Sequence, residues 1–133
     1  MEPIKTELVV IGAGPGGYTA AFYAADKGKK VLLVDQDKRL GGVCLNRGCI
    51  PSKALLHATE LMREAKGSGE IRGITFGKPT VHLEKLRAWK ESILDKLAQG
   101  ISSLGRARGI EVLRGRGRFE NSRTLRVETK DGP

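Results

Sequence analysis

Aromatic residues, cysteine and histidine are scarce in this sequence of 133 residues. Aromatics make up only 5% of the residues, and cysteine and histidine occur twice each. No apolar run approaches the roughly 18 residues of a transmembrane helix, and Leu8 to Ile11 is too short for a signal-peptide core. The composition therefore argues against a membrane span. We expect a cytoplasmic protein, in which two cysteines are catalytic or metal-binding rather than structural.

Positive charge is abundant by contrast, with a formal net charge of +9. Seven arginines crowd the C-terminal third: Arg106, Arg108, Arg114, Arg116, Arg118, Arg123 and Arg126. Nucleic-acid-binding faces usually interleave such cations with aromatics, but Phe119 is the one aromatic residue within this cluster. We therefore expect no nucleic-acid partner. The arginines are interpreted as a solvated face, or as one that meets an acidic partner or an absent part of the same protein.

The first 35 residues follow the order strand, glycine turn, helix, strand. Glu7 to Ile11 is interpreted as a buried strand, because Leu8 to Ile11 form a short continuous apolar run. Tyr18 to Lys27 is strongly helical, and Gly28 stands where a left-handed C-terminal cap is favoured. A second apolar run, Val31 to Val34, is closed by Asp35. This order predicts an α/β fold with a parallel sheet.

The rest of the sequence predicts two helices and several short strands. A helix is expected over Ala54 to Lys66, followed by a glycine-rich loop with a short extended piece at Ile74 to Phe76. Pro79 and Thr80 open a longer helix with an apolar stripe, namely Leu83, Leu86, Ile93, Leu97, Ile101 and Leu104. Three extended pieces, with a turn at Asn121-Ser122, suggest a small antiparallel meander: Glu111 to Arg114, Gly117 to Glu120 and Thr124 to Thr129. The turn residues at 131–133 suggest a truncated chain.

The glycine turn has the pattern of a dinucleotide-binding motif. Gly12, Gly14 and Gly17 follow a predicted strand and open a helix, and Asp35 stands eighteen residues beyond Gly17. Gly12 permits a tight turn, Gly14 lets the backbone approach a pyrophosphate, and Gly17 lets helix and strand pack closely. The helix N-terminus would hold the phosphates, and Asp35 the ribose hydroxyls of FAD or NAD rather than NADP. The alternative is a set of simple turn-forming glycines.

The two cysteines stand five residues apart, at Cys44 and Cys49. In a regular helix this spacing separates them by about 140° around the axis, too far for a relaxed disulfide. A disulfide therefore requires a distorted backbone, which Gly48 and Pro51 favour. Such a pair can be poised between dithiol and disulfide, as an electron relay requires. A zinc half-site and two unrelated thiols are the alternatives, but the spacing of the two histidines does not suit zinc, and we expect no metal.

These motifs carry a resemblance to a known family. The segment from Gly41 to Leu56, together with Gly12 to Gly17, Asp35 and the helix around Trp89, resembles the N-terminal part of the dihydrolipoamide dehydrogenases. These enzymes belong to the pyridine nucleotide-disulfide oxidoreductases. The resemblance covers essentially the whole sequence, and Ile50 to Leu56 favours this group over the glutathione and mercuric reductases. It implies a partial Rossmann-like FAD-binding domain over residues 1–133, without the NAD and interface domains.

The resemblance also implies roles for individual residues. Cys44 would be the interchange thiol, and Cys49 would lie against the flavin as the charge-transfer thiolate. Lys53 would sit near the flavin N5 edge, where a cation stabilises the thiolate and the reduced flavin. Gly42 would belong to the FAD site, and the backbone of Gly117 would contact the adenine end of FAD.

Two residues depart from the pattern of this family. Val43 stands where many relatives have threonine, and Arg47 stands between the cysteines where small apolar residues are common. Arg47 would lower the pKa of a thiol that it faced, but we expect it to point away.

The parent enzyme would pass electrons from dihydrolipoamide, carried on a lipoyl domain, to the Cys44-Cys49 disulfide, then to FAD and to NAD. Its partners would be components of a 2-oxo acid dehydrogenase complex, and it would be a homodimer. Neither His57 nor His82 fits the base of the family, so we expect the isolated chain to be inactive. The alternatives are a related FAD-dependent disulfide reductase, a flavin- or redox-binding module without turnover and, more distantly, a basic nucleic-acid binder.

Overall fold

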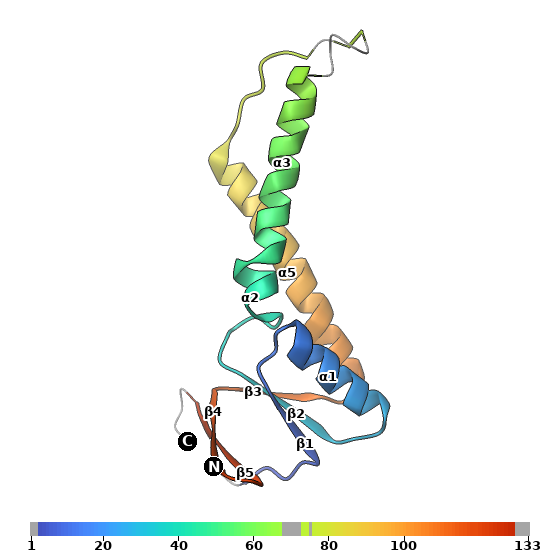
Figure 1. Ribbon diagram of the computed structural model, residues 1–133, viewed down its shortest axis with the longest axis vertical. Coiled ribbons are helices and arrows are strands. Elements are labelled where there is room, and N and C mark those ends of the chain that lie inside the picture. The colour runs from blue at the N-terminus through green and yellow to red at the C-terminus, as the bar shows by residue number, and fades with distance from the viewer. Residues whose placement is uncertain (1–2, 68–72, 75, 130–133) are drawn as a thin grey trace.

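The computed structural model describes residues 3–67, 73–74 and 76–129. A parallel three-stranded sheet lies at one end of the molecule, with β2 between its two neighbours (Figure 1): β1 (Leu8–Ile11), β2 (Val31–Asp35) and β3 (Glu111–Arg114). Val9 lies opposite Leu32 in the first pair, and Leu33 lies opposite Val112 in the second. All four apolar residues of β2 are buried. The parallel sheet and the expected second strand are therefore confirmed.

The first strand is less buried than its sequence predicts. Leu8 and Ile11, at its two ends, are 38% and 46% exposed, whereas Val9 and Val10 are half-buried. Within the described residues, β1 is an edge strand that pairs on one side only, with β2. The expectation of a fully buried strand is therefore wrong at its ends.

Helix α1 (Pro15–Asp26) follows the glycine turn and lies next to the sheet in Figure 1. Proline is favoured at such a first helical position because its missing N–H would be unpaired there. At the other end Gly28 has a φ of +79°, and its N–H donates to the carbonyl of Ala25 at 2.8 Å. The N–H of Lys29 donates to the carbonyl of Ala24 at 3.1 Å. The left-handed glycine cap predicted here is confirmed.

Within the described residues, three helices connect β2 to β3: α2 (Gly42–Arg47), α3 (Cys49–Gly67) and α5 (Leu83–Ala107). Figure 1 shows α3 and α5 crossing beside each other and reaching away from the sheet, well beyond α1. The expected helix starts at Ala54 and near Pro79 differ from these bounds, because α3 begins directly after a break at Gly48 and α5 begins after the extended His82. None of the helices in the described ranges is long and apolar enough to cross a membrane.

Helix α5 turns a different face to the core from the predicted stripe. Its buried residues are Leu94, Ala98, Ile101 and Gly105. From the predicted stripe only Ile101 is buried, while Leu83, Leu97 and Leu104 are 61%, 43% and 51% exposed. Small residues face inward because α1 approaches closely there: a Cβ added at Gly105 would lie 3.5 Å from Cε1 of Phe22. Leu86 and Ile93 are half-buried, so the predicted stripe is wrong at its three exposed positions.

One hydrophobic cluster joins the sheet to the helices and to the residues around the glycine turn. Its buried members are Ala13, Ala21, Val31, Leu33, Leu40, Leu45, Leu94, Ala98, Ile101 and Ile110. Ala13 of the glycine turn and Leu45, which lies between the two cysteines, both belong to this cluster. The core therefore sets the position of the glycine turn relative to the cysteine segment.

The C-terminal strands form a hairpin rather than a three-stranded meander. β4 (Arg116–Asn121) and β5 (Thr124–Glu128) pair antiparallel, and Oδ1 of Asn121 accepts the N–H of Arg123 in the turn at 2.9 Å. The third expected strand of the meander is β3, which joins the parallel sheet instead. The antiparallel pair is confirmed and the pairing of β3 is corrected. The extended piece expected at Ile74 to Phe76 lies partly outside the described residues.

Gly115 separates β3 from the hairpin and explains why β3 and β4 belong to different sheets. Its N–H donates to the carbonyl of Asp35 at 3.0 Å, which holds the chain at the end of β2. A Cβ at this position would lie 2.5 Å from the carbonyl oxygen of Glu128. Glycine therefore lets the chain leave the parallel sheet and enter the hairpin without a clash.

Candidate active site

The turn between β1 and α1 requires glycine at two positions. Gly12 has a φ of +92°, and its N–H donates to the carbonyl of Val34 at 2.7 Å. Gly17 lies so close to this turn that an added Cβ would stand 1.7 Å from the carbonyl oxygen of Gly12. The geometry gives Gly12 and Gly17 the steric roles that the sequence pattern predicts for them.

The glycine turn also meets the cysteine segment directly. Gly42 has a φ of +61°, and a Cβ added to it would lie 2.6 Å from Cα of Gly14. Beside this crossing, the N–H of Gly41 donates to the carbonyl of Ala13 at 2.8 Å. The two segments therefore cross backbone to backbone, which places the start of α2 next to the start of α1.

The N-terminus of α1 suits an anionic group. Gly14 is its N-cap and makes no side-chain capping hydrogen bond, and no acidic residue stands in the first turn. The backbone N–H groups and the helix dipole at such an end favour a phosphate. A Cβ added at Gly14 would have only Cα of Gly42 within 4 Å, at 3.9 Å. No other atom therefore crowds the position above Gly14. This cradle fits the pyrophosphate of a dinucleotide.

Asp35 lies at the end of β2, beside the glycine turn. Its Oδ2 accepts the N–H of Ala13 at 2.5 Å, and its Oδ1 accepts the N–H of Asp37 at 2.6 Å. A carboxylate has about four lone-pair sites, so both oxygens retain capacity for a further donor such as a ribose hydroxyl. Asp35 thus stabilises the turn, a role that sequence analysis missed, and remains available to a ligand.

The backbone breaks between the two cysteines. α2 ends before Gly48, which has φ −127° and ψ −107°, and α3 begins at Cys49. A Cβ at Gly48 would lie 3.1 Å from the carbonyl oxygen of Val43 and 3.4 Å from Cα of Cys44. The segment is therefore two helices joined at a close crossing, and the five-residue spacing does not carry the cysteines around one continuous helix.

This break brings the side chains of Cys44 and Cys49 together. Both are free thiols, with Cys44 half-buried and Cys49 exposed. A hydrogen bond between the two side chains raises the pKa of Cys44 above its usual value, and partial burial raises it further. The positive charge of Lys53 acts on Cys44 in the opposite direction and lowers this pKa, with a smaller effect. Two interacting thiols and one nearby cation therefore lie around the break between α2 and α3.

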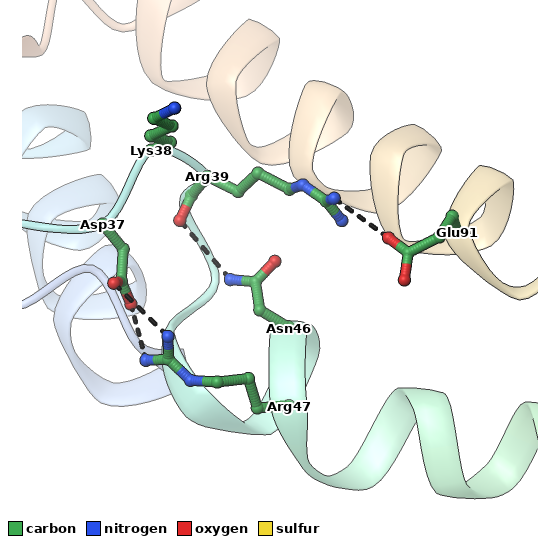
Figure 2. Close-up of a pocket in the computed structure, with 6 residues that line it drawn as sticks. All are labelled: Asp37, Lys38, Arg39, Asn46, Arg47 and Glu91. Atoms are coloured by element: carbon green, nitrogen blue, oxygen red, sulfur yellow. Dashed lines mark hydrogen bonds and ion pairs between the residues drawn. The ribbon is translucent and has the colours of Figure 1, made fainter.

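Arg47 points toward Asp37 (Figure 2), and it is not among the groups that shift the pKa of Cys44. Its Nη2 donates to Oδ2 of Asp37 at 2.8 Å, and the ion pair lies on the loop that follows β2. In the same loop, Arg39 pairs with Glu91 of α5 at 3.0 Å. Asn46 donates from Nδ2 to the carbonyl of Gly42 at 3.0 Å. A polar hollow of about 260 Å³ is lined by Asp37, Lys38, Arg39, Asn46, Arg47 and Glu91.

Gly117 and the histidines lie in other parts of the molecule. Gly117 is half-buried in β4, opposite Val127, and its strand follows the contact between Gly115 and Asp35. His57 is exposed on α3, and His82 precedes α5. Within the ranges that the structure describes, three or more acidic, cysteine or histidine side chains nowhere gather as a metal would require.

Comparison with known proteins agrees with this geometry. The family described as "Pyridine nucleotide-disulphide oxidoreductase" matches residues 6–131, which is nearly the whole chain. The chain belongs to this family. Three similar relatives are each named "Dihydrolipoyl dehydrogenase", from Vibrio cholerae, Haemophilus influenzae and Bacillus subtilis. They are 44%, 46% and 46% identical over 98%, 98% and 94% of this chain. The chain spans 27%, 27% and 26% of their lengths.

For this pyridine nucleotide-disulfide oxidoreductase chain, sequence analysis missed several residues that shape the site. The double glycine before α2 was a signal for Gly41, whose φ of +110° requires glycine. Asp37 and Asn46 gave no comparable signal, because their roles depend on contacts that only the folded chain creates. The signal for Gly115 was equally weak, since a glycine between two short strands also occurs in ordinary loops.

Proposed function

We propose that this chain is the N-terminal, FAD-binding part of a cytoplasmic dihydrolipoyl dehydrogenase. The observation that carries the proposal is the contact between Cys44 and Cys49 at the break at Gly48. The backbone crossing of Gly42 and Gly14 places this dithiol segment beside a glycine turn suited to a pyrophosphate. The family match and the names of the relatives support the same activity.

The glycine turn and Asp35 would bind the dinucleotide. Gly12, Gly14 and Gly17 shape the turn so that N–H groups of α1 face the pyrophosphate, and Gly42 keeps the adjoining surface free of a side chain. Asp35 would accept the ribose hydroxyls while it holds the N–H of Ala13. The backbone of Gly117 would contact the adenine end. FAD, when bound, would accept the electron pair from the dithiol and supply it to NAD.

The cysteines would exchange electrons with a dithiol substrate. A thiolate of dihydrolipoamide attacks Sγ of Cys44, which breaks the Cys44–Cys49 bond and leaves Cys49 as a thiolate. The second thiol of the substrate, after losing its proton, displaces Cys44 and closes the lipoamide disulfide. Two electrons and two protons leave the substrate, and the protein gains the reduced pair. Lys53 stabilises negative charge on the pair, in line with its effect on the pKa of Cys44.

The isolated chain would not complete this cycle. It spans about a quarter of the length of the relatives, and the NAD and interface domains that the family implies would lie in the remainder. Neither His57 nor His82 is among the groups that shift the pKa of Cys44. We propose that the parent protein is a homodimer and that its substrate is carried on a lipoyl domain of a 2-oxo acid dehydrogenase complex.

The activity is tested with a full-length protein that contains this chain. NAD reduction by dihydrolipoamide is measured for the parent and for the Cys44→Ser and Cys49→Ser variants. We expect turnover in the parent and a loss of at least about 100-fold in each variant, because one thiol cannot form the internal disulfide. Unchanged turnover in either variant would refute the relay. Turnover with glutathione disulfide and no activity with dihydrolipoamide would indicate a related disulfide reductase instead.

A further inference from the structure

Arg47, one of the residues between the two cysteines, forms an ion pair with the loop after β2. Arg47 ends α2, one residue before the break at Gly48. Its Nη2 and Nη1 donate to Oδ2 and Oδ1 of Asp37 at 2.8 and 3.5 Å, a two-point contact that sets the direction of the side chain (Figure 2). The end of α2 is therefore tied to the loop that leads into it from β2, ten residues earlier in the chain.

Asp37 is itself held at the nucleotide end of the sheet. Its N–H donates to Oδ1 of Asp35 at 2.6 Å, and its carbonyl accepts Nη1 of Arg114. The other carboxylate oxygen of Asp35 accepts the N–H of Ala13 in the glycine turn. A continuous series of contacts thus runs from the glycine turn through Asp35 and Asp37 to Arg47, which is two residues from Cys49.

We propose that Arg47, with Asp37 as its partner, is a positioning residue that holds the break in the helix so that the two thiols stay within bonding reach. The proposal rests on the proposed dithiol function and adds a determinant of its redox equilibrium. Arg47 acts through the backbone at Gly48 and does not act on the thiol as a charge, since Lys53 is the cation that acts on Cys44.

The size of the effect follows from the exposure of the ion pair. The side chains of Arg47 and Asp37 are 60% and 30% exposed. An ion pair at a surface changes an equilibrium constant by about two- to fivefold, and added salt weakens it. The pair therefore tunes disulfide formation and does not decide whether the disulfide forms at all.

The test measures the equilibrium between the reduced chain and oxidised dithiothreitol, a cyclic disulfide. Cys44 and Cys49 lose two electrons and two protons as their S–S bond forms, and the cyclic disulfide gains both and opens to its dithiol. We expect Arg47→Gln and Asp37→Asn each to lower the equilibrium constant about two- to fivefold. In the double variant the loss should equal that of one single variant, because both remove the same interaction.

Two controls separate positioning from general destabilisation. Arg63→Gln removes an exposed arginine of α3 that pairs with Glu60 at 3.1 Å, and should leave the redox equilibrium unchanged. In 1 M salt the difference between the parent chain and Arg47→Gln should shrink, because the ion pair is screened. Equal equilibrium constants for the unsubstituted chain, Arg47→Gln and Asp37→Asn would overturn the proposal while leaving the dithiol function intact. Failure of the unsubstituted chain to form the disulfide would instead overturn the dithiol function.

Discussion

The glycine turn and the cysteine segment touch each other but are held in place by different means. In the turn, the backbone is so crowded that an added Cβ at Gly17 would stand 1.7 Å from a carbonyl oxygen. In the cysteine segment beyond its crossing at Gly42, side chains hold the backbone, through the thiol contact and the pair of Arg47 with Asp37. Steric requirements act in an all-or-none way, whereas side-chain contacts at a surface contribute in small steps. The nucleotide end should therefore tolerate little change, and the dithiol end should be tunable.

The largest effect is expected from Gly17→Ala. The new methyl group cannot fit beside the carbonyl of Gly12, so the turn and α1 must separate, at a cost of more than about 3 kcal/mol. Urea unfolding followed by circular dichroism measures this loss. Gly16→Ala is the matched control, because a Cβ there meets nothing within 4 Å and alanine favours the helix. Equal stability of the two variants would remove the contrast between the two regions.

A smaller but clear loss is expected from Asp35→Asn. The two N–H groups of Ala13 and Asp37 bind different oxygens of Asp35, and in asparagine one of these oxygens becomes an NH2 group, which donates and cannot accept. We expect a loss of about 2 kcal/mol in the free energy of unfolding, because these hydrogen bonds are made to a charged acceptor. Asp26→Asn serves as control, since it removes only an exposed pair with Arg108. A loss no larger than that of the control would show that Asp35 does not stabilise the turn.

Gly48→Ala carries the steric test into the cysteine segment. The added Cβ would lie 3.1 Å from the carbonyl oxygen of Val43, a tight contact that a small shift relieves. We expect a loss of about 1 kcal/mol and a lower yield of internal disulfide, because the shift moves the thiols. Gly100→Ala on α5, where a Cβ meets nothing within 4 Å, is the comparison. A stability loss as large as that of Gly17→Ala would show that both regions are governed by backbone crowding.

The smallest effect is expected from Lys53→Met. Removal of the cation should raise the pKa of Cys44 further, so that less thiolate exists near neutral pH. Alkylation of Cys44, followed by mass spectrometry as a function of pH, should slow at neutral pH and become equal to the parent rate in strong alkali. Lys66→Met, at the far end of α3, should leave the profile unchanged. An unshifted profile for Lys53→Met would contradict the assigned effect of this charge.

The raised pKa of Cys44 also makes the stability of the folded chain depend on pH. Folding raises the pKa of Cys44, so the folded chain binds this proton more tightly than the unfolded chain does. The contribution to stability is complete below the usual thiol pKa of about 8.5 and is lost as the pH rises through the higher value in the folded state. Urea unfolding of the parent and of Cys44→Ser across this range isolates the contribution.

Features that depend on neighbouring residues were predicted well from sequence. The buried β2, the cap at Gly28 and the need for glycine at Gly12 follow from short apolar runs and from backbone conformations that glycine favours. The interruption of the helix near Gly48 was also predictable, because the cysteine spacing and Pro51 both oppose a continuous helix.

Features that depend on distant residues were not predictable in the same way. The inner face of α5 uses Ala98 and Gly105 because α1 approaches it closely, and hydrophobicity alone favoured the wrong leucines. β3 joins the parallel sheet because β2 offers it an edge, whereas its own sequence suits either kind of sheet. The partner of Arg47 is likewise set by the path of the loop after β2.

The central claim is that the break at Gly48 lets Cys44 and Cys49 form one internal disulfide. Trypsin cleaves after Arg47, so digestion separates the two cysteines onto the peptides 40–47 and 48–53.

The most direct measurement is therefore a tryptic mass map of the oxidised chain without reduction. Our account predicts that the two peptides are found joined, with the mass of two hydrogen atoms lost, in material from monomeric chains. Recovery of the two peptides separately after oxidation, each with its own adduct or in a link to another chain, would contradict it.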